Sequence, residues 1–314
     1  MYRRYFFRLL STIAVMCLVL FFVFYHQFSL LSVIFIAFLL GLRHGFDIDH
    51  IIAIDNVTRQ LVEKKRAGPN IGLFFALGHS SIVFLLTLSI VLGMRFIQSE
   101  PSGLLATGAF IGTLVSAVFL WITGVLNTVT LVKLKSKHQD LRTNSVLSLA
   151  LKPLFKLIDR PYKMYPIGFL FGLGFDTATE IALLGLAATG MLSGQSIWLI
   201  LALPISFAMG MALVDSVDAA LMVKLFENQR NACGIYRQVN MAVLGLIISL
   251  SFIVGSIECA SLFSNVPVRR LSDFISDYAP WIGVTITAIF VFLVGLPALS
   301  RIRNRNFITT KDSV

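Results

Sequence analysis

The sequence predicts an all-α polytopic membrane protein with eight transmembrane helices. Of its 314 residues, 57% are hydrophobic and only 13% are charged, and the mean hydropathy is +0.84, whereas a soluble domain carries about 25% charged residues. Several apolar runs reach the roughly 20 residues that a helix needs to cross the hydrocarbon core of a bilayer. The net charge of +10 comes mostly from Lys and Arg between these runs, which indicates membrane topology rather than nucleic-acid binding.

The eight predicted spans follow one another along the whole chain. Their ranges are 9–27, 30–57, 71–95, 104–132, 165–191, 196–223, 239–262 and 278–299. The first span follows a basic N-terminus, as in a signal peptide, but it lacks a small-x-small cleavage site. We therefore expect it to remain as an uncleaved transmembrane helix, separated from the second span by Tyr25 to Ser29.

The distribution of basic residues predicts that both termini are cytoplasmic. With the N-terminus inside, 22 of the 26 Lys and Arg residues fall in cytoplasmic segments, in agreement with the positive-inside rule. The segment 133–163 is polar and basic, so we expect a cytoplasmic connector between two halves of one integral membrane domain, 1–314. A solvated connector that fixes topology is favoured over a partner-binding segment.

Ionisable side chains cluster inside the predicted spans, where each costs at least about 2.5 kcal/mol and indicates function. The clusters are RHGFDIDHIIAIDN (43–56), LGHSS (77–81), LGFDTATE (173–180) and GMALVDSVD (210–218), and Glu258 lies near the end of the seventh span. Carboxylates far outnumber the single arginine, so protons or a metal cation must balance them. Histidines beside carboxylates, without paired cysteines, favour a divalent first-row transition metal.

The candidate metal ligands are His44, Asp47, Asp49 and His50. At about 100° per residue, His44 and Asp47 share a helical face with Asp55, but His50 points about 120° away from His44. A regular helix cannot aim both histidines at one ion. The sequence therefore predicts one of two arrangements. Either the helix is interrupted near Gly45, as in the broken helices of transporters, or Asp49 and His50 face another helix.

A further set of polar residues is expected to line the metal pathway or to orient its ligands. The set is Arg43, Asp55, His79, Asn127, Asp176, Glu180, Asp215 and Asp218. We expect Arg43 to pair with an aspartate. His79 is a third imidazole ligand, a proton relay or a hydrogen-bonded core histidine, and Asp55 is either solvated or in contact with the ion. For the other acids, inter-helix hydrogen bonding is the alternative role.

A short repeat divides the chain into two similar halves. The tripeptide GFD occurs at 45–47 and at 174–176, and the next polar cluster follows at a similar distance, with Gly78 33 residues after Gly45 and Gly210 36 residues after Gly174. Because the second and fifth spans run in opposite directions, spans 2–4 and 5–7 are predicted to form an inverted repeat. Such repeats place the binding site near the midplane of the membrane.

The motifs resemble those of the nickel/cobalt transporter (NiCoT) family of permeases. The resemblance rests on RHGFDIDHIIAIDNVTR, FFALGHSSIV (74–83), LGFDTATE and GMALVDSVD, in this order between residues 41 and 218. It implies eight spans with cytoplasmic ends and high-affinity uptake of Ni²⁺ or Co²⁺ across the cytoplasmic (inner) membrane, with the metal as substrate and no cofactor. The family's essential HxxxxDH motif falls on His44, Asp49 and His50. Gly45, Phe46 and Ile48 depart from the commonest pattern at positions that are not ligands.

Two other functions compete with uptake. An efflux permease of related architecture often carries a long His-rich cytoplasmic loop, but 133–163 contains only His138, which favours uptake. A membrane-embedded metalloenzyme would need a motif such as HExxH, and the chain has none. The chain also lacks a GxxxxGK[ST] sequence for ATP binding, which favours a secondary permease.

Overall fold

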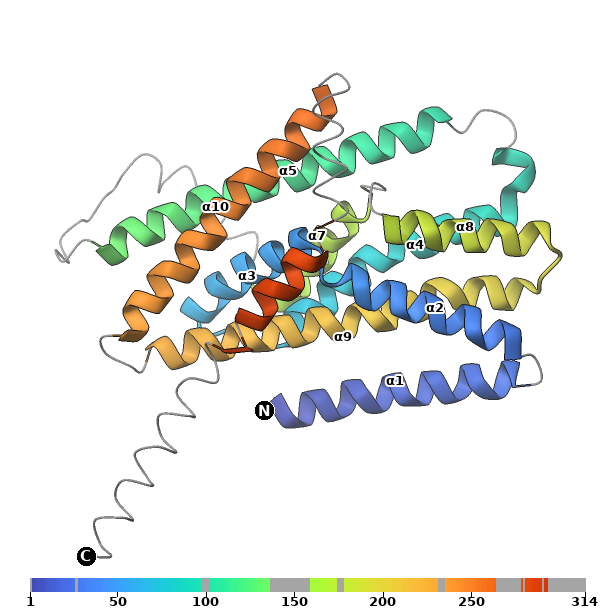
Figure 1. Cartoon of the computed structure of the whole chain (residues 1–314), viewed down its shortest axis with the longest axis horizontal. Helices are drawn as coiled ribbons and strands as arrows, with labels where there is room; N and C mark the ends of the chain where they lie inside the picture. The colour runs from blue at the N-terminus through green and yellow to red at the C-terminus, as the bar shows by residue number, and fades with distance from the viewer. Residues whose placement is uncertain are drawn as a thin grey trace, which may run out of the picture.

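The structure is a computed structural model that describes residues 2–25, 28–97, 102–135, 159–173, 178–230, 235–263, 278, 280–289 and 291–292. All regular structure in these residues is helical, with no strand among them (Figure 1). The helices are α1 (Tyr2–Phe24), α2 (Phe28–His44), α3 (Ile48–Glu63), α4 (Asn70–Ile97), α5 (Ser102–Lys135), α7 (Met164–Phe171), α8 (Ala178–Leu192), α9 (Ile197–Arg230) and α10 (Ile235–Phe263). A 3₁₀ turn, Pro161–Lys163, precedes α7, and Pro280–Ile289 is a further short apolar helix.

Five of the described helices are long and apolar enough to cross a membrane, and six spans result if the bent pair α2–α3 counts as one. These six match the predicted spans 1–4, 6 and 7. The predicted fifth span contains α7 and α8, on either side of residues outside the described part, and the predicted eighth contains Pro280–Ile289. The structure therefore establishes a multi-pass helical membrane protein with five to six candidate spans.

The predicted interruption near Gly45 is confirmed. The axes of α2 and α3 meet at 57°, and the chain between them is a turn in which the Gly45 N–H still donates to the Gly41 carbonyl (3.0 Å). Asp47 then takes an extended conformation (φ −64°, ψ 141°) as the residue that precedes α3. A Cβ on Gly45 would lie 2.8 Å from the Val214 Cβ, so glycine here allows the break to approach α9.

Helix α9 is the centre of the bundle, with α2, α3 and α4 packed along it, and α7 packs on α4. Three of these interfaces are backbone contacts that depend on glycine, and the α4–α9 contact is made at Gly72, where a Cβ would clash with the Asp215 carbonyl oxygen. A Cβ on Gly41 or Gly210 would clash with the facing backbone of the α2–α9 interface, and one on Gly78 or Gly168 would clash with the backbone of the α4–α7 interface. Small residues that let helix backbones approach are a common packing device in membranes.

Helices α5 and α10 form a separate pair. They cross each other along one side of the molecule (Figure 1) and pack mainly on one another, with smaller contacts to α3, α7 and α9. Gly255 of α10 permits the crossing, because a Cβ there would lie 2.9 Å from the Trp121 ring. The pair thus lies beside the α9-centred bundle as a second layer.

An ion-pair cluster joins the turn after α3 to the segment before α7. The Asp159 carboxylate lies 2.5 Å from Lys163 Nζ and 3.7 Å from Arg66 Nη1, and the hydrogen bond from Lys163 lowers the pKa of Asp159. These contacts hold residues 64–66 and 159–163 at the same end of the molecule.

The glycine contacts generate a stability prediction. We expect Gly210→Ala to lower the free energy of unfolding by about 1–3 kcal/mol, because the added methyl group overlaps the α2 backbone. The matched control is Gly185→Ala on α8, where a Cβ meets nothing within 4 Å. Melting temperatures of the purified proteins in detergent measure the difference, and equal values for the two variants would contradict the prediction.

Candidate metal centre

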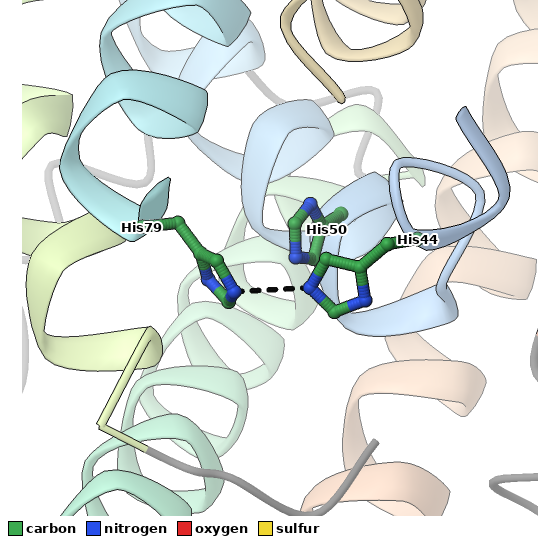
Figure 2. A group of neighbouring side chains, drawn as sticks. All are labelled: His44, His50 and His79. Carbon is green, nitrogen blue, oxygen red and sulfur yellow. Dashed lines mark hydrogen bonds between the residues drawn. The ribbon is translucent and has the colours of Figure 1, made fainter. Parts of the chain in front are cut away.

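Three buried histidines from three helices face one another at the centre of the bundle. His44 ends α2, His50 lies in the first turn of α3 and His79 lies on α4 (Figure 2). One nitrogen from each ring lies within 4.8 Å of the other two, and the ring centroids are 4.6 to 4.9 Å apart. The side chains are at most 3% exposed, so they form a compact set of imidazole donors.

The α2–α3 break brings two of these rings together. In a continuous helix His44 and His50 would point in directions about 120° apart, but the turn at 45–47 swings α3 so that the two rings meet edge to face. The break also ends α2 at the site, and the partial negative charge of a helix C-terminus favours a cation. Asp47 and Asp49 lie at the start of α3, where the partial positive charge of the helix N-terminus stabilises their negative charges.

Carboxylates hold two of the rings by their Nδ1 atoms. His44 Nδ1 lies 2.7 Å from Asp47 Oδ2, and Thr179 Oγ1 lies 3.1 Å from the same nitrogen. His50 Nδ1 lies 3.4 Å from Asp215 Oδ1 on α9. Carboxylates that receive one ring N–H commonly fix a histidine tautomer and leave the other nitrogen for a metal.

Glu180, at the start of α8, reaches the histidine cluster directly. Its Oε1 lies 2.7 Å from His79 Nε2 and 3.9 Å from His44 Nε2, and the two Nε2 atoms are 3.0 Å apart (Figure 2). The site can therefore offer two imidazole nitrogens and one carboxylate oxygen around one point, with His50 alongside.

A small cavity of about 20 Å³ opens onto this cluster, which is room for one water-sized particle. Its lining residues are His44, Asp47, Asp49, His50, His79, Gly112, Thr113, Ser116, Phe171, Glu180 and Glu258. The α5–α10 pair supplies Thr113 and Ser116 from α5 and Glu258 from α10. The cavity therefore lies between the α9-centred bundle and this pair.

A second group of carboxylates continues from the histidines along α9 and α3. Asp215 and Asp218 lie one turn apart on α9, and Asp218 is close enough to Asp55 of α3 for their charges to interact. Asp55 and Asp218 are at most 1% exposed, and their carboxylate oxygens have no hydrogen-bond partner among the described residues. The positive charge of Arg59, one turn further along α3, acts on Asp55.

The structure brings most of the proposed residues together. His44, Asp47, Asp49 and His50 line one cavity with His79 and Glu180. Asp215 touches His50, and Asp218 and Asp55 continue the group. Asp55 is fully buried, so of its two alternatives the solvated position does not hold.

Two of the proposed residues that the structure describes do not join this group. Arg43 is exposed on α2 and makes no ion pair with a described carboxylate, so its expected pairing with an aspartate stays a prediction. Asn127 is remote from the cavity and donates to Asn56 Oδ1, while Asn56 donates to Thr123 Oγ1 (2.9 Å). Asp176 lies outside the described residues.

Sequence reasoning missed several participants. Thr113 and Ser116 are ordinary hydroxyl residues of a transmembrane helix, and their spacing of three residues is the only signal that places them on one face. Thr179 lies inside LGFDTATE without an ionisable group. Arg59 lies just beyond the predicted second span (30–57), and its side chain is only 6% exposed within α3.

The fold and the site together define a polytopic membrane protein with a buried His-carboxylate centre suited to a divalent transition-metal ion. The sequence model of the high-affinity nickel-transport protein family matches residues 30–301. The chain belongs to this family. It is thus a metal-ion transporter, and the alternative of a membrane metalloenzyme is wrong.

Curated relatives agree with this assignment. The chain is 36% identical over 276 residues to the hydrogenase nickel incorporation protein HupN of Bradyrhizobium diazoefficiens, covering 81% of this chain and 72% of that protein. It is 37% identical over 245 residues to the nickel transporter NixA of Staphylococcus aureus (73% and 72%). It is also 32% identical over 276 residues to the cobalt transport protein NhlF of Rhodococcus rhodochrous (82% and 78%). No solved structure shows significant similarity.

The Asn56–Asn127 contact generates a prediction that separates structure from metal binding. We expect Asn127→Ala to lower the free energy of unfolding by about 1–3 kcal/mol, because it leaves the buried Asn56 amide short of a partner. The stoichiometry of Ni²⁺ binding should stay unchanged. Thermal melts and equilibrium dialysis of the purified protein measure the two quantities, and lost Ni²⁺ binding by a folded variant would place Asn127 at the metal centre instead.

Proposed function

We propose that the protein is a secondary permease that takes up Ni²⁺, Co²⁺ or both across the cytoplasmic membrane, with His44, His50 and His79 as the imidazole ligands. The mutual approach of these three rings from α2, α3 and α4 is the observation that carries the proposal. Neutral imidazole suits nickel and cobalt better than magnesium or calcium, which prefer cages of oxygen ligands. The relatives named as nickel and cobalt transporters support the same choice of metals.

The ligand geometry needs only a small adjustment to hold an ion. Bonds of about 2.1 Å from an ion to two nitrogens require these to be at most about 4.2 Å apart, and the three nitrogens lie within 4.8 Å. A metal ion between His44 Nε2 and His79 Nε2 replaces their 3.0 Å hydrogen bond with two coordination bonds. Glu180 Oε1 is placed to complete the set, while Asp47 and Asp215 hold the rings in orientation.

The proposed topology has eight spans, with both termini and the connector 133–163 in the cytoplasm. It treats α7 with α8 as the fifth span and the chain from 278 as the eighth. The ion-pair cluster supports it, because the basic turn after α3 and the end of the connector lie at one end of the molecule. On this topology the cavity lies toward the outer halves of α5 and α10.

The buried carboxylates on α9 and α3 then provide the route from the histidines to the cytoplasm. In this topology α3 and the second half of α9 both lead inward from the histidines. The buried carboxylates of Asp215, Asp218 and Asp55 offer successive oxygen donors along this path. A divalent ion gains about 4.6 kcal/mol per 100 mV of inside-negative potential, so the potential alone can drive uptake.

An inverted repeat of spans 2–4 and 5–7 is part of the proposal. Under this repeat α2 corresponds to α7, and α4 corresponds to α9. The glycine contacts fit this correspondence, because the α2–α9 interface and the α7–α4 interface are built alike. Helix α2 meets α9 through Gly41 and Gly210, and α7 meets α4 through Gly168 and Gly78. Gly78 and Gly210 are also the pair that the sequence spacing relates.

Metal accumulation in cells tests the proposed function. We expect cells that express the protein to accumulate radioactive Ni²⁺ or Co²⁺ above the empty-vector level, and His50→Ala to abolish the increase because it removes a ligand. His138→Ala, a histidine of the connector, is the matched control and should accumulate metal as the wild type does. Accumulation at the empty-vector level by the wild type would contradict uptake, and accumulation below that level would indicate efflux.

Cysteine labelling tests the topology. In a variant with Cys17, Cys233 and Cys259 changed to Ser, we expect Ser145→Cys and Ser313→Cys to react with a membrane-impermeant maleimide only in inside-out vesicles. The control is Ser99→Cys, between the third and fourth spans, which should react in intact cells. Labelling of Ser313→Cys in intact cells, with Ser145→Cys still protected there, would show an odd number of spans after the connector.

A further inference from the structure

We propose that Glu258, with Asp49, forms an entry site where a divalent cation from outside first binds before it reaches the histidines. The inference rests on the proposed uptake function and extends it to a residue of α10, outside the polar motifs of the sequence. Glu258 is the only acidic residue in α5 and α10, and it lines the same cavity as the histidine cluster.

The burial of the lining residues locates these two carboxylates at the mouth of the cavity. Asp49 and Glu258 are only half-buried, whereas the other residues of the lining are buried. An ion that approaches the cavity therefore meets Asp49 and Glu258 before it meets a histidine. The negative charge of a carboxylate attracts a hydrated cation at a distance, whereas each imidazole nitrogen that coordinates the ion must displace a bound water.

A hydroxyl group in the same wall is also placed for an ion or for its water. Ser116 is 93% buried, at 7% exposure, and its Oγ lines the cavity without a hydrogen-bond partner among the described residues. Other hydroxyls of α5, such as those of Thr123 and Thr128, donate to the carbonyl four residues earlier. Ser116 Oγ instead remains available to the cavity, where a hydrated cation offers both an electrostatic partner and hydrogen bonds.

The two carboxylates belong to different layers of the structure. Asp49 is on α3 of the α9-centred bundle, and Glu258 is on α10 of the α5–α10 pair. Since both line one small cavity, a divalent ion in that cavity interacts favourably with carboxylates of both layers. A cleft with one sign of charge and low-dielectric walls also concentrates counter-ions at its mouth.

Initial rates of radioactive Ni²⁺ uptake test the inference. We expect Glu258→Gln to raise the KM for Ni²⁺ about tenfold, since the charged mouth no longer concentrates the ion, with a maximal rate close to that of the wild type. Glu258→Asp should restore most of the affinity because it keeps the charge. Ser256→Ala, an exposed position on α10, is the control for disturbance of the helix and should leave the KM unchanged.

The dependence of the KM on ionic strength provides a second readout. A purely structural role of Glu258 would leave this dependence unchanged. We expect the KM of the wild type to rise with salt at constant Ni²⁺ activity, and the KM of Glu258→Gln to rise less, because screening acts on the charge that this variant lacks. A wild-type KM and salt dependence in Glu258→Gln would overturn the inference while leaving uptake intact. Absence of uptake by the wild type would instead overturn the proposed function.

Discussion

Two histidines six residues apart can face one ion only if the helix between them is interrupted, and the architecture depends on this constraint. The interruption at 45–47 frees backbone groups that a bilayer cannot satisfy, so the break must be enclosed by protein. Helix α9 approaches it at Gly45, and Gly283 of the short helix 280–289 leaves space for the Phe46 carbonyl. The break thereby determines which helices surround it and where His79 and Glu180 can reach the same point.

The buried charges are arranged in an order that fits the passage of a cation. Half-buried carboxylates come first, then imidazoles held by Asp47 and Asp215, and then the fully buried pair Asp218 and Asp55. Burying a carboxylate without a partner costs several kcal/mol, which packing alone does not explain. Asp47 and Asp215 hold histidine rings in orientation, whereas the carboxylate oxygens of Asp55 and Asp218 have no hydrogen-bond partner among the described residues.

Local geometry made the centre of the site predictable from the sequence, whereas its surroundings depend on contacts between distant residues. The fixed rotation per residue in a helix made a break near Gly45 one of two expected arrangements, and intramembrane charges identified the polar clusters. The partner of Asn127 is Asn56, 71 positions away, and nothing in either segment indicates that they meet. Arg43 shares the motif of the ligands, but its position on α2 directs it away from them. Ser116 looks like any helix hydroxyl until the neighbouring α10 is in place.

The glycine interfaces have a mechanical consequence. Where two helix backbones touch, no side-chain rotamer can change to absorb a displacement, so α2 with α9 and α4 with α7 resist sliding. These four helices therefore act as a stiff frame around the histidines. The α5–α10 pair, in contrast, shares only small contacts with that frame. The fold thus combines a closely packed frame, which carries His44 and His79, with a helix pair that is attached to it by few contacts.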